Sequence, residues 1–258
     1  MTPPRQAEKL GKWSKQNTTE PMSRARRYLL VFGIASIFAC DGIARAQDGE
    51  HAPDTMAARM LACAPCHGDK GQGTGDNYFP RLAGKPAGYL YNQLVAFRDG
   101  RRKYPPMNYL LEFLPDSYLK TMADYFASAQ PPFPPPAIPD VSAAMLARGE
   151  ALATEGDPAH QIPACANCHG PSFTGMEPAI PGLLGLRATY IGAQLGAWRY
   201  GTRTATAPDC MQIVAGHLTE DDVKALTAWL SSRPMAANPA PVARGSLPMP
   251  LACGSEPK

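Results

Sequence analysis

The 258-residue chain is long enough for one or two domains. Only 18% of its residues are charged, while proline and glycine are abundant, which favours compact, loop-rich domains over long helical bundles. The formal charge of +3 comes from residues 1–46, which hold eight basic and three acidic residues. The remainder has 17 Lys and Arg against 19 Asp and Glu, and this balance of about −2 gives no indication of nucleic-acid binding.

The N-terminal segment up to Ala46 is predicted to be a secretory signal peptide. Residues 23–27 are basic, and residues 28–39 form an apolar run that is too short for a comfortable membrane span. Ala44 and Ala46 place small residues at the two positions that a signal peptidase reads, so cleavage is expected after Ala46. Met22 is an alternative start. An uncleaved signal anchor is the other interpretation, and it would bring peripheral membrane association.

Two Cys-x-x-Cys-His pentapeptides, residues 63–67 and 165–169, organise the rest of the chain. Two thiols separated by two residues can reach both vinyl groups of one porphyrin, and the histidine that follows then lies under the iron. Zinc would require more closely spaced pairs, and a thioredoxin-like dithiol would require a βαβ context. The pattern therefore predicts two haem c groups. They are attached through Cys63, Cys66, Cys165 and Cys168, with His67 and His169 as axial iron ligands.

The sequence is a tandem repeat. The second pentapeptide starts at residue 165, 102 residues after the first at residue 63, and the similarity continues beyond it. Residues 89–98 match 190–199, and residues 114–128 match 218–232. The prolines that separate the copies cannot continue a helix and favour a semi-rigid linker. The predicted organisation is a signal peptide (1–46), a first domain (47–130), a Pro-rich linker (131–140), a second domain (141–234) and a Pro/Ala-rich tail (235–258).

Each half is predicted to be all-α. Apolar or amphipathic residues recur at positions i, i+3, i+4 and i+7 of a middle and a last helix in both halves. That spacing starts at Leu90, Leu119, Ile191 and Val223. Asp54 and Ser142 can cap the helices before the pentapeptides, and Thr219 with Asp222 approximates a capping box. No stretch alternates well enough to predict a strand.

The second axial ligand of each iron is predicted to be a methionine from the loop between the middle and last helices. Met107 lies 40 residues after His67, and Met211 lies 42 residues after His169. A thioether gives a low-spin iron with a raised potential and leaves no open position for a substrate. Met122 is on a helical apolar face and is expected to pack in the core.

Cys210, next to Met211, leaves two alternatives open. Its thiolate could ligate the iron, which would lower the potential and suit a catalytic haem. Alternatively, Cys210 pairs with Cys253 and ties the tail back near the second haem. His217 is expected to be solvated or to be a helix-end partner, and the tail is expected to lie on the surface or to be disordered.

Together these residues resemble the dihaem cytochrome c4 family. The resemblance rests on residues 162–171, on residues 80–84 and on a Tyr-x-x-x-Gln-Leu-x-x-aromatic-Arg pattern in both halves, and it covers roughly residues 54–233. It implies two tandem class I cytochrome c domains, each wrapped round one covalently bound haem, with the haem propionates facing each other across a pseudo-two-fold axis. It also implies that the carbonyls of Pro80 and Pro181 accept the Nδ1–H of the axial histidines.

The resemblance implies a periplasmic one-electron carrier between a quinol-oxidising complex and a terminal oxidase or reductase. One alternative is a dihaem enzyme such as a thiosulfate dehydrogenase or a haem peroxidase, which only Cys210 favours. Another is the cytochrome subunit of a membrane dehydrogenase.

Tyr89 and Tyr190 would contact propionates or pack in the core. A basic run would steer an acidic partner or form a solvated helix end. It consists of Arg98, Arg101, Arg102 and Lys103.

Overall fold

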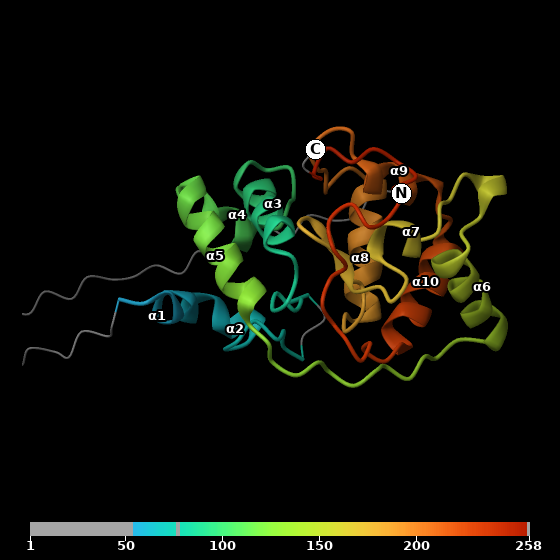
Figure 1. Cartoon of the computed structure of the whole chain (residues 1–258), viewed down its shortest axis with the longest axis horizontal. Helices are drawn as coiled ribbons and strands as arrows, with labels where there is room; N and C mark the ends of the chain where they lie inside the picture. Colours follow the sequence, from blue (N-terminus) through green and yellow to red (C-terminus); the bar gives the residue numbers. More distant parts are fainter. Residues whose placement is uncertain (1–53, 76–77, 257–258) are drawn as a thin grey trace, which may run out of the picture. The chain divides into compact units, whose positions relative to one another are not determined.

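The computed structural model describes residues 54–75 and 78–256 (Figure 1). The chain divides into a unit of residues 1–49 and a unit of residues 50–258, and every described residue belongs to the second unit. The predicted signal peptide lies outside the described residues. Within the described part, none of the helices combines the length and the apolar composition that a membrane span needs.

The first half consists of short helices round one apolar core. The buried side chains of Leu90, Leu119 and Phe126 lie at the predicted helical spacing. Helix α3 packs against α5, and α1 also contacts α5. The elements are α1 (Met56–Met60), the 3-10 turn η1 (Leu61–Cys63), α2 (Ala64–His67), α3 (Ala87–Arg98), α4 (Pro105–Leu111) and α5 (Asp116–Ser128).

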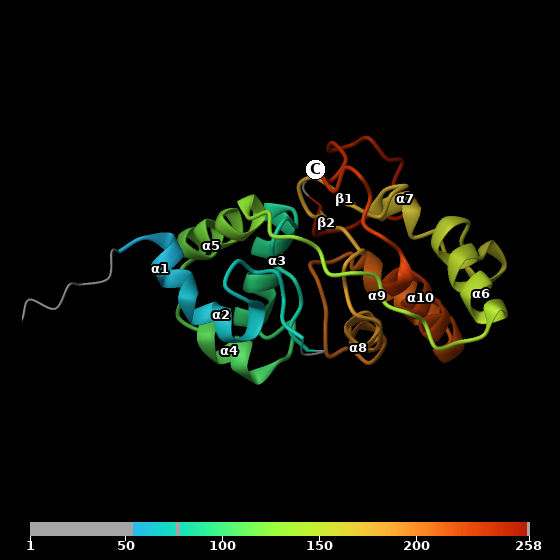
Figure 2. The same ribbon diagram turned by 90° about the horizontal axis from the view of Figure 1, so that it is seen from below.

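The second half repeats this plan with a larger core. Helix α6 crosses α10 at Gly149, where any side chain would collide with the carbonyl of Ala225. Figure 2 shows α6 and α10 side by side. The elements are α6 (Ala143–Thr154), the 3-10 turn η2 (Pro158–His160), α7 (Ala166–His169), β1 (Gly175–Met176), β2 (Ile180–Pro181), α8 (Ala188–Arg199), α9 (Cys210–His217) and α10 (Glu220–Ser232).

The antiparallel pair β1–β2 corrects the expectation of no strand. Each strand has two residues, which is too short for an alternating pattern to appear in the sequence. Gly175 lies opposite Pro181 in this pair, so the hairpin shapes the loop that follows the second pentapeptide.

The helix caps are predicted correctly in the second half and wrongly in the first. Ser142 caps α6, and Thr219 with Asp222 forms both hydrogen bonds of a capping box at α10. Helix α1 is capped by Thr55, whose hydroxyl accepts a backbone N–H at 3.2 Å. Asp54 instead forms a surface ion pair. Propensity places Asp above Thr at the N-cap position, so of these two adjacent candidates it favours the one that the structure does not use.

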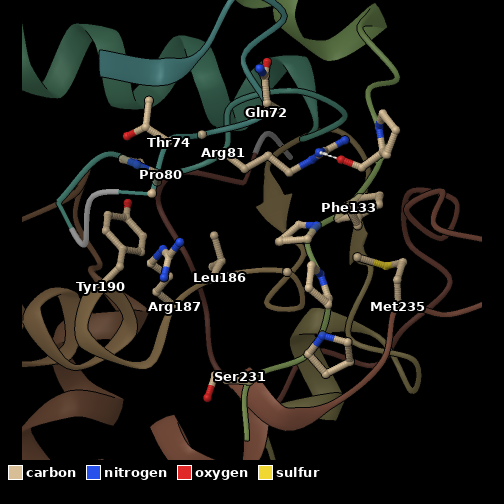
Figure 3. Close-up of a pocket in the computed structure, with 18 of the residues that line it drawn as sticks. Gln72, Thr74, Pro80, Arg81, Phe133, Leu186, Arg187, Tyr190, Ser231 and Met235 are labelled. Atoms are coloured by element: carbon tan, nitrogen blue, oxygen red, sulfur yellow. Dashed lines mark hydrogen bonds between the residues drawn. The ribbon is translucent and has the colours of Figure 1, made fainter. Parts of the chain in front are cut away.

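The proline-rich linker is attached at both ends. The buried guanidinium of Arg81 donates to the carbonyls of Pro131 at 2.6 Å and Pro132 at 2.8 Å, and it lies 3.8 Å from the ring centroid of Phe133 (Figure 3). At the other end the N–H of Ala137 donates to α10 at 2.9 Å. These contacts fix the linker against both halves, so it is a spacer and not a free hinge.

Candidate haem sites

Each pentapeptide ends in a buried histidine whose orientation is fixed. His67 ends α2 and His169 ends α7. The Nδ1 atoms lie 3.0 Å and 2.7 Å from the carbonyl oxygens of Pro80 and Pro181. A carbonyl can only accept, so Nδ1 carries the proton and Nε2 keeps its lone pair. Burial also lowers the pKa of both histidines, which favours the neutral imidazole that metals bind.

The four pentapeptide cysteines lie outside any disulfide, whereas Cys210 and Cys253 are bonded to each other. Burial raises the pKa of Cys165 to about 12, and it also raises the pKa of Cys63 and of Cys168. A structural zinc site needs about four ligands close together. The described residues contain no group of three or more His, Cys, Asp and Glu side chains that could hold a metal ion. The zinc alternative is therefore not supported.

Each predicted methionine packs against the same apolar core as a cysteine of the pentapeptide in its own half. Met107 in α4 is half-buried and packs on the first core together with Cys63. Met211 in α9 packs in the same way on the second core, as Cys165 does. Met122 is buried in the first core, as its helical spacing predicts. Each half thus gathers the cysteine and methionine of one predicted haem site around a single core.

A matched pair of buried arginines joins the two halves. Arg102 and Arg203 are 8% and 3% exposed, and their backbones pair as an antiparallel bridge. Each guanidinium donates to one glutamine in each half and to one tyrosine in the opposite half. The bonds of Arg203 therefore match those of Arg102, with the roles of the two halves exchanged. Arg102 bonds to Gln93 at 3.0 Å, Gln194 at 2.7 Å and Tyr190 at 2.9 Å; Arg203 bonds to Gln194 at 2.8 Å, Gln93 at 2.7 Å and Tyr89 at 3.4 Å.

These arginines lack acidic partners in the part of the chain that the structure describes. Lys85 is a third cation near this interface, and its Nζ donates to the carbonyl of Gly182 at 3.0 Å. Burial alone would raise the pKa of Tyr89, but Arg203, Arg102 and Lys85 outweigh it and lower that pKa. Buried charge with neutral partners is costly. The cluster therefore fits an anionic group, and the propionates of haem are such a group.

Trp198 gives independent support for this fit. Among the described residues its buried indole N–H has no hydrogen-bond partner, and the guanidinium of Arg203 lies 3.7 Å from its ring centroid. An unpaired buried donor beside uncompensated cations is the arrangement expected where an acidic cofactor group binds. The first half has Phe97 at the matching position, so this donor is specific to the second half.

The basic run of the first half is mostly neutralised or buried. Arg98 pairs with Asp116 at 2.6 Å and with Asp99 at 3.0 Å, and Arg101 pairs with Asp99 at 3.4 Å. Arg102 lies in the interface, so both expectations for it, a docking cation and a solvated helix end, are wrong. The sequence signal for its role was the repeat itself: Arg203 matches Arg102, and each arginine lies nine residues after a glutamine of the repeated pattern.

Two alternatives beside Met211 are resolved. The disulfide between Cys210 and Cys253 confirms the predicted pairing, so Cys210 has no free thiolate for the iron and the sequence feature that favoured the catalytic alternative is gone. His217 is exposed at the end of α9, and its Nδ1 lies 3.0 Å from the carbonyl of Gln161, in line with the expected helix-end role.

A cavity of about 470 Å³ lies between the halves beside the linker (Figure 3). Arg187 and Tyr190 of the second half and Phe133 of the linker contribute to its lining. Of the ten predicted site residues only Pro80 lines it, and none of the cysteines, histidines or methionines does. The cavity therefore adjoins the first haem site at Pro80 and the arginine cluster at Tyr190.

Comparison with known proteins agrees with this geometry. The cytochrome c family model matches residues 55–127 and 146–234, one segment in each half. A thiosulfate dehydrogenase electron acceptor from Thiomonas intermedia is 37% identical over 187 residues, which cover 71% of this chain and 85% of that protein. Cytochrome c4 from Pseudomonas aeruginosa is 37% identical over 175 residues, which cover 67% of this chain and 84% of that protein.

Two solved structures share the fold. Reduced cytochrome c4 from Pseudomonas stutzeri is 30% identical with a TM-score of 0.59, over 68% of this chain and 95% of that one. A thiosulfate dehydrogenase (TsdBA) from Marichromatium purpuratum is 35% identical with a TM-score of 0.62, over 70% of this chain, which spans 40% of that longer protein. The all-α fold with two tandem cytochrome c domains is thus confirmed. The chain belongs to the dihaem cytochrome c4 family, whose cytochrome c domains carry covalently bound haem c.

Proposed function

We propose that this protein is a periplasmic one-electron carrier with two haems of histidine and methionine ligation. The observation that carries the proposal is the repetition, in each half, of a buried histidine held at Nδ1 and a methionine packed on the same core. With both axial positions filled by the protein, no position remains for a substrate. Such a site stores an electron and passes it on without bond chemistry.

Each residue has a role that its position supports. Bound haem c supplies a one-electron redox centre. The cysteines of the two pentapeptides hold it covalently, while His67 and His169 supply nitrogen ligands and Met107 and Met211 supply sulfur. The carbonyls of Pro80 and Pro181 keep each imidazole in one orientation and increase its donor strength. Arg102 and Arg203 would neutralise propionates and keep water out of the interface.

The electron donor in this proposal is a redox enzyme of sulfur metabolism or a quinol-oxidising complex, and the acceptor is a terminal oxidase or reductase. Two relatives that are 37% identical are named as electron acceptors of thiosulfate dehydrogenase, which favours the first donor. The bonded state of Cys210 favours a carrier over a thiosulfate dehydrogenase. A cytochrome subunit of a membrane enzyme remains the alternative if the signal segment is retained as an anchor.

Reduction assays test the proposal. The oxidised holoprotein is mixed with thiosulfate alone, with thiosulfate plus a purified thiosulfate dehydrogenase, and with a quinol plus a quinol-oxidising complex. We expect both haems to be reduced only when an enzyme is present. Turnover of thiosulfate by the holoprotein alone would contradict a pure carrier and support the enzymatic alternative.

A further inference from the structure

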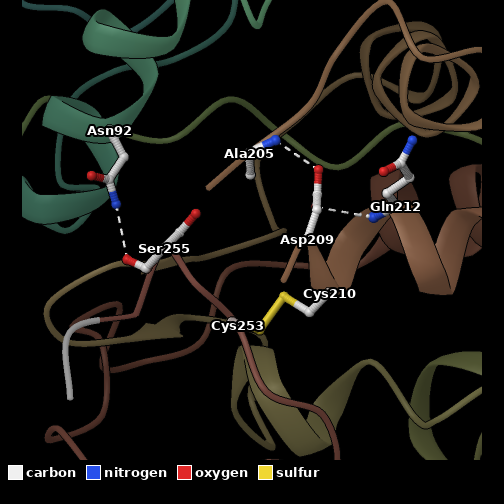
Figure 4. Close-up of a disulfide and its surroundings, with 7 residues drawn as sticks. All are labelled: Asn92, Ala205, Asp209, Cys210, Gln212, Cys253 and Ser255. Carbon is white, nitrogen blue, oxygen red and sulfur yellow. Dashed lines mark hydrogen bonds between the residues drawn. A yellow bond between two sulfur atoms is a disulfide. The ribbon is translucent and has the colours of Figure 1, made fainter. Parts of the chain in front are cut away.

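The start of helix α9 is held by a side-chain cap. Asp209 caps the helix: one carboxylate oxygen accepts the N–H of Gln212 at 3.1 Å, and the other accepts the N–H of Ala205 at 2.6 Å (Figure 4). Cys210 is the first residue of the helix, and Met211, the proposed sulfur ligand, is the second. Whatever fixes Cys210 therefore also fixes the backbone of Met211.

The disulfide anchors this point to the C-terminal tail. Cys210 is bonded to Cys253 across a separation of 43 residues (Figure 4). The next residue of the tail, Gly254, donates its N–H to the carbonyl of Pro208 at 2.9 Å. A side chain at Gly254 would collide with the carbonyl of Ala207, so the tail backbone lies directly on the segment that precedes α9. One covalent bond and one hydrogen bond thus hold the tail on both sides of Asp209.

The tail is itself held at two further places. Upstream, Val242 exchanges hydrogen bonds with the hairpin after the second pentapeptide, through Gly175 and Glu177, both at 2.9 Å. Downstream, the carbonyl of Ser255 accepts a hydrogen bond at 3.0 Å from the side chain of Asn92, which belongs to α3 of the first half (Figure 4). The tail therefore connects the start of α9 to the pentapeptide loop of its own half and to a helix of the other half.

The first half holds its methionine in another way. Asn108 follows Met107, accepts the N–H of Tyr104 at 2.8 Å, and donates to the carbonyls of Phe97 at 2.5 Å and Arg102 at 2.9 Å. The matching residue in the second half is Gln212. It is exposed, and its side chain forms no hydrogen bond with the residues that the structure describes. The second half lacks this side-chain anchor, and its disulfide holds the residue on the other side of the methionine, one position before it.

We propose that the Cys210–Cys253 bond and the tail residues 253–255 form a clamp that positions Met211 on the second haem. The clamp would do for Met211 what Asn108 does for Met107. This inference rests on the proposed ligation of the second iron by Met211. A thioether is a weak neutral ligand, so its residence on iron depends on how far the backbone around it can move. Closing a loop across 43 residues restricts that movement.

The test measures how readily imidazole displaces each methionine from the oxidised holoprotein. The methyl signals of the two methionines in the NMR spectrum, assigned with Met107→Ala and Met211→Ala, identify the haem that reacts. In Cys210→Ser/Cys253→Ser, displacement of Met211 should be about tenfold faster or more, with Met107 unchanged. In Asn108→Ala, displacement of Met107 should be faster and that of Met211 unchanged. Reducing and alkylating the disulfide of the folded wild-type holoprotein should reproduce the first result without any substitution.

The outcomes separate the clamp from the ligand assignment. Each methionine-ligated ferric haem has a sulfur-to-iron charge-transfer absorption band. If Met211→Ala leaves the bands of both haems intact, the proposed ligand is wrong. If that variant loses one band, but neither the serine variant nor the alkylated protein releases Met211 more than about twofold faster, the ligand stands and the clamp is overturned. Faster release of Met107 in the serine variant would also overturn it, because the effect would then be a general loss of stability.

Discussion

The two halves share the residues of their central contact and differ on their outer surfaces. Arg102 and Arg203, with the glutamine and tyrosine partners of each, are the same residue types in both halves. Away from the interface the first half exposes Tyr109 (78%) and Phe113 (87%) on and after α4, while the second half has Ile213 and His217 at the matching positions. Equivalent residues meet each other at a pseudo-two-fold axis, so the same residue types recur there, whereas an outward surface is under no such constraint.

The largest expected effect comes from removing one axial methionine. Met107→Ala and Met211→Ala should each abolish one of two sulfur-to-iron bands and lower the potential of one haem by on the order of 0.1 V, because the soft sulfur that stabilises the reduced iron is lost. Potentiometric titration followed at the haem bands measures this. If either variant lost sulfur-to-iron band intensity equally from both haems, the two sites would not be independent, and the prediction would be contradicted.

The crossing of α6 and α10 distinguishes the halves by packing. Gly149→Val should destabilise the second half by about 2–4 kcal/mol, because the new side chain meets the carbonyl of Ala225 and the Cβ of Trp229. Gly196→Ala in α8 is the matched control. Its Cβ would have no neighbour within 4 Å, so the helix should gain about 0.5–1 kcal/mol. Denaturant unfolding of the holoprotein measures both, and destabilisation by Gly196→Ala would contradict the packing argument.

The interface arginines test the symmetry directly. A buried positive charge near a haem destabilises the ferric state relative to the ferrous state. Arg102→Leu and Arg203→Leu each remove such a charge, so both variants should lower haem potentials by tens of millivolts. Because the two residues occupy equivalent positions, we expect shifts of similar size. Lys103→Leu, at an exposed position, should shift neither potential measurably. An upward shift, or an effect of only one arginine, would contradict a shared propionate-binding role.

A smaller, pH-dependent effect comes from an ion-pair cluster of the second half. Arg148 pairs with Asp157 at 2.9 Å and with Asp222 at 2.8 Å. Hydrogen bonds from His160 and Arg148 lower the pKa of Asp157. Burial alone would raise the pKa of Asp222, but bonds from Thr219 and Arg148 outweigh it and lower that pKa. A carboxyl group whose pKa is lowered in the folded state stabilises the fold at pH values above its ordinary pKa of 3.8. This stabilisation disappears as the pH falls and the carboxylates are protonated.

Arg148→Met should therefore cost about 1 kcal/mol at neutral pH and progressively less in acid. Thermal unfolding of the variant and the wild type at a series of pH values measures the difference. A difference that grows as the pH falls would contradict the assigned sign. Lys120→Met, which removes an exposed ion pair in the first half, is the control and should change stability little at any pH.

Local chemistry in the sequence predicted most of the fold. The helices and their core faces follow from apolar spacing, as at Leu119 and Phe126. The histidine supports at Pro80 and Pro181 followed from the family resemblance. The pairing of Cys210 with Cys253 followed from counting the cysteines outside the pentapeptides.

Long-range contacts could not be predicted in the same way. Arg102 lies in a basic run that has the composition of a solvated helix end, and its burial depends on the second half closing over it. Arg81 looks like part of a loop motif, but its guanidinium binds the linker 50 residues further on. The tail has the composition of a disordered segment, and its attachment depends on Cys253, Gly254 and Asn92 meeting in space.

Near-infrared magnetic circular dichroism of the oxidised holoprotein tests the central claim most directly, since it reports the axial ligands of low-spin haem. We predict sulfur-to-iron charge-transfer intensity equivalent to two histidine–methionine haems and no high-spin signal. Intensity for only one such haem, or a bis-histidine or thiolate signature at the other, would contradict the account.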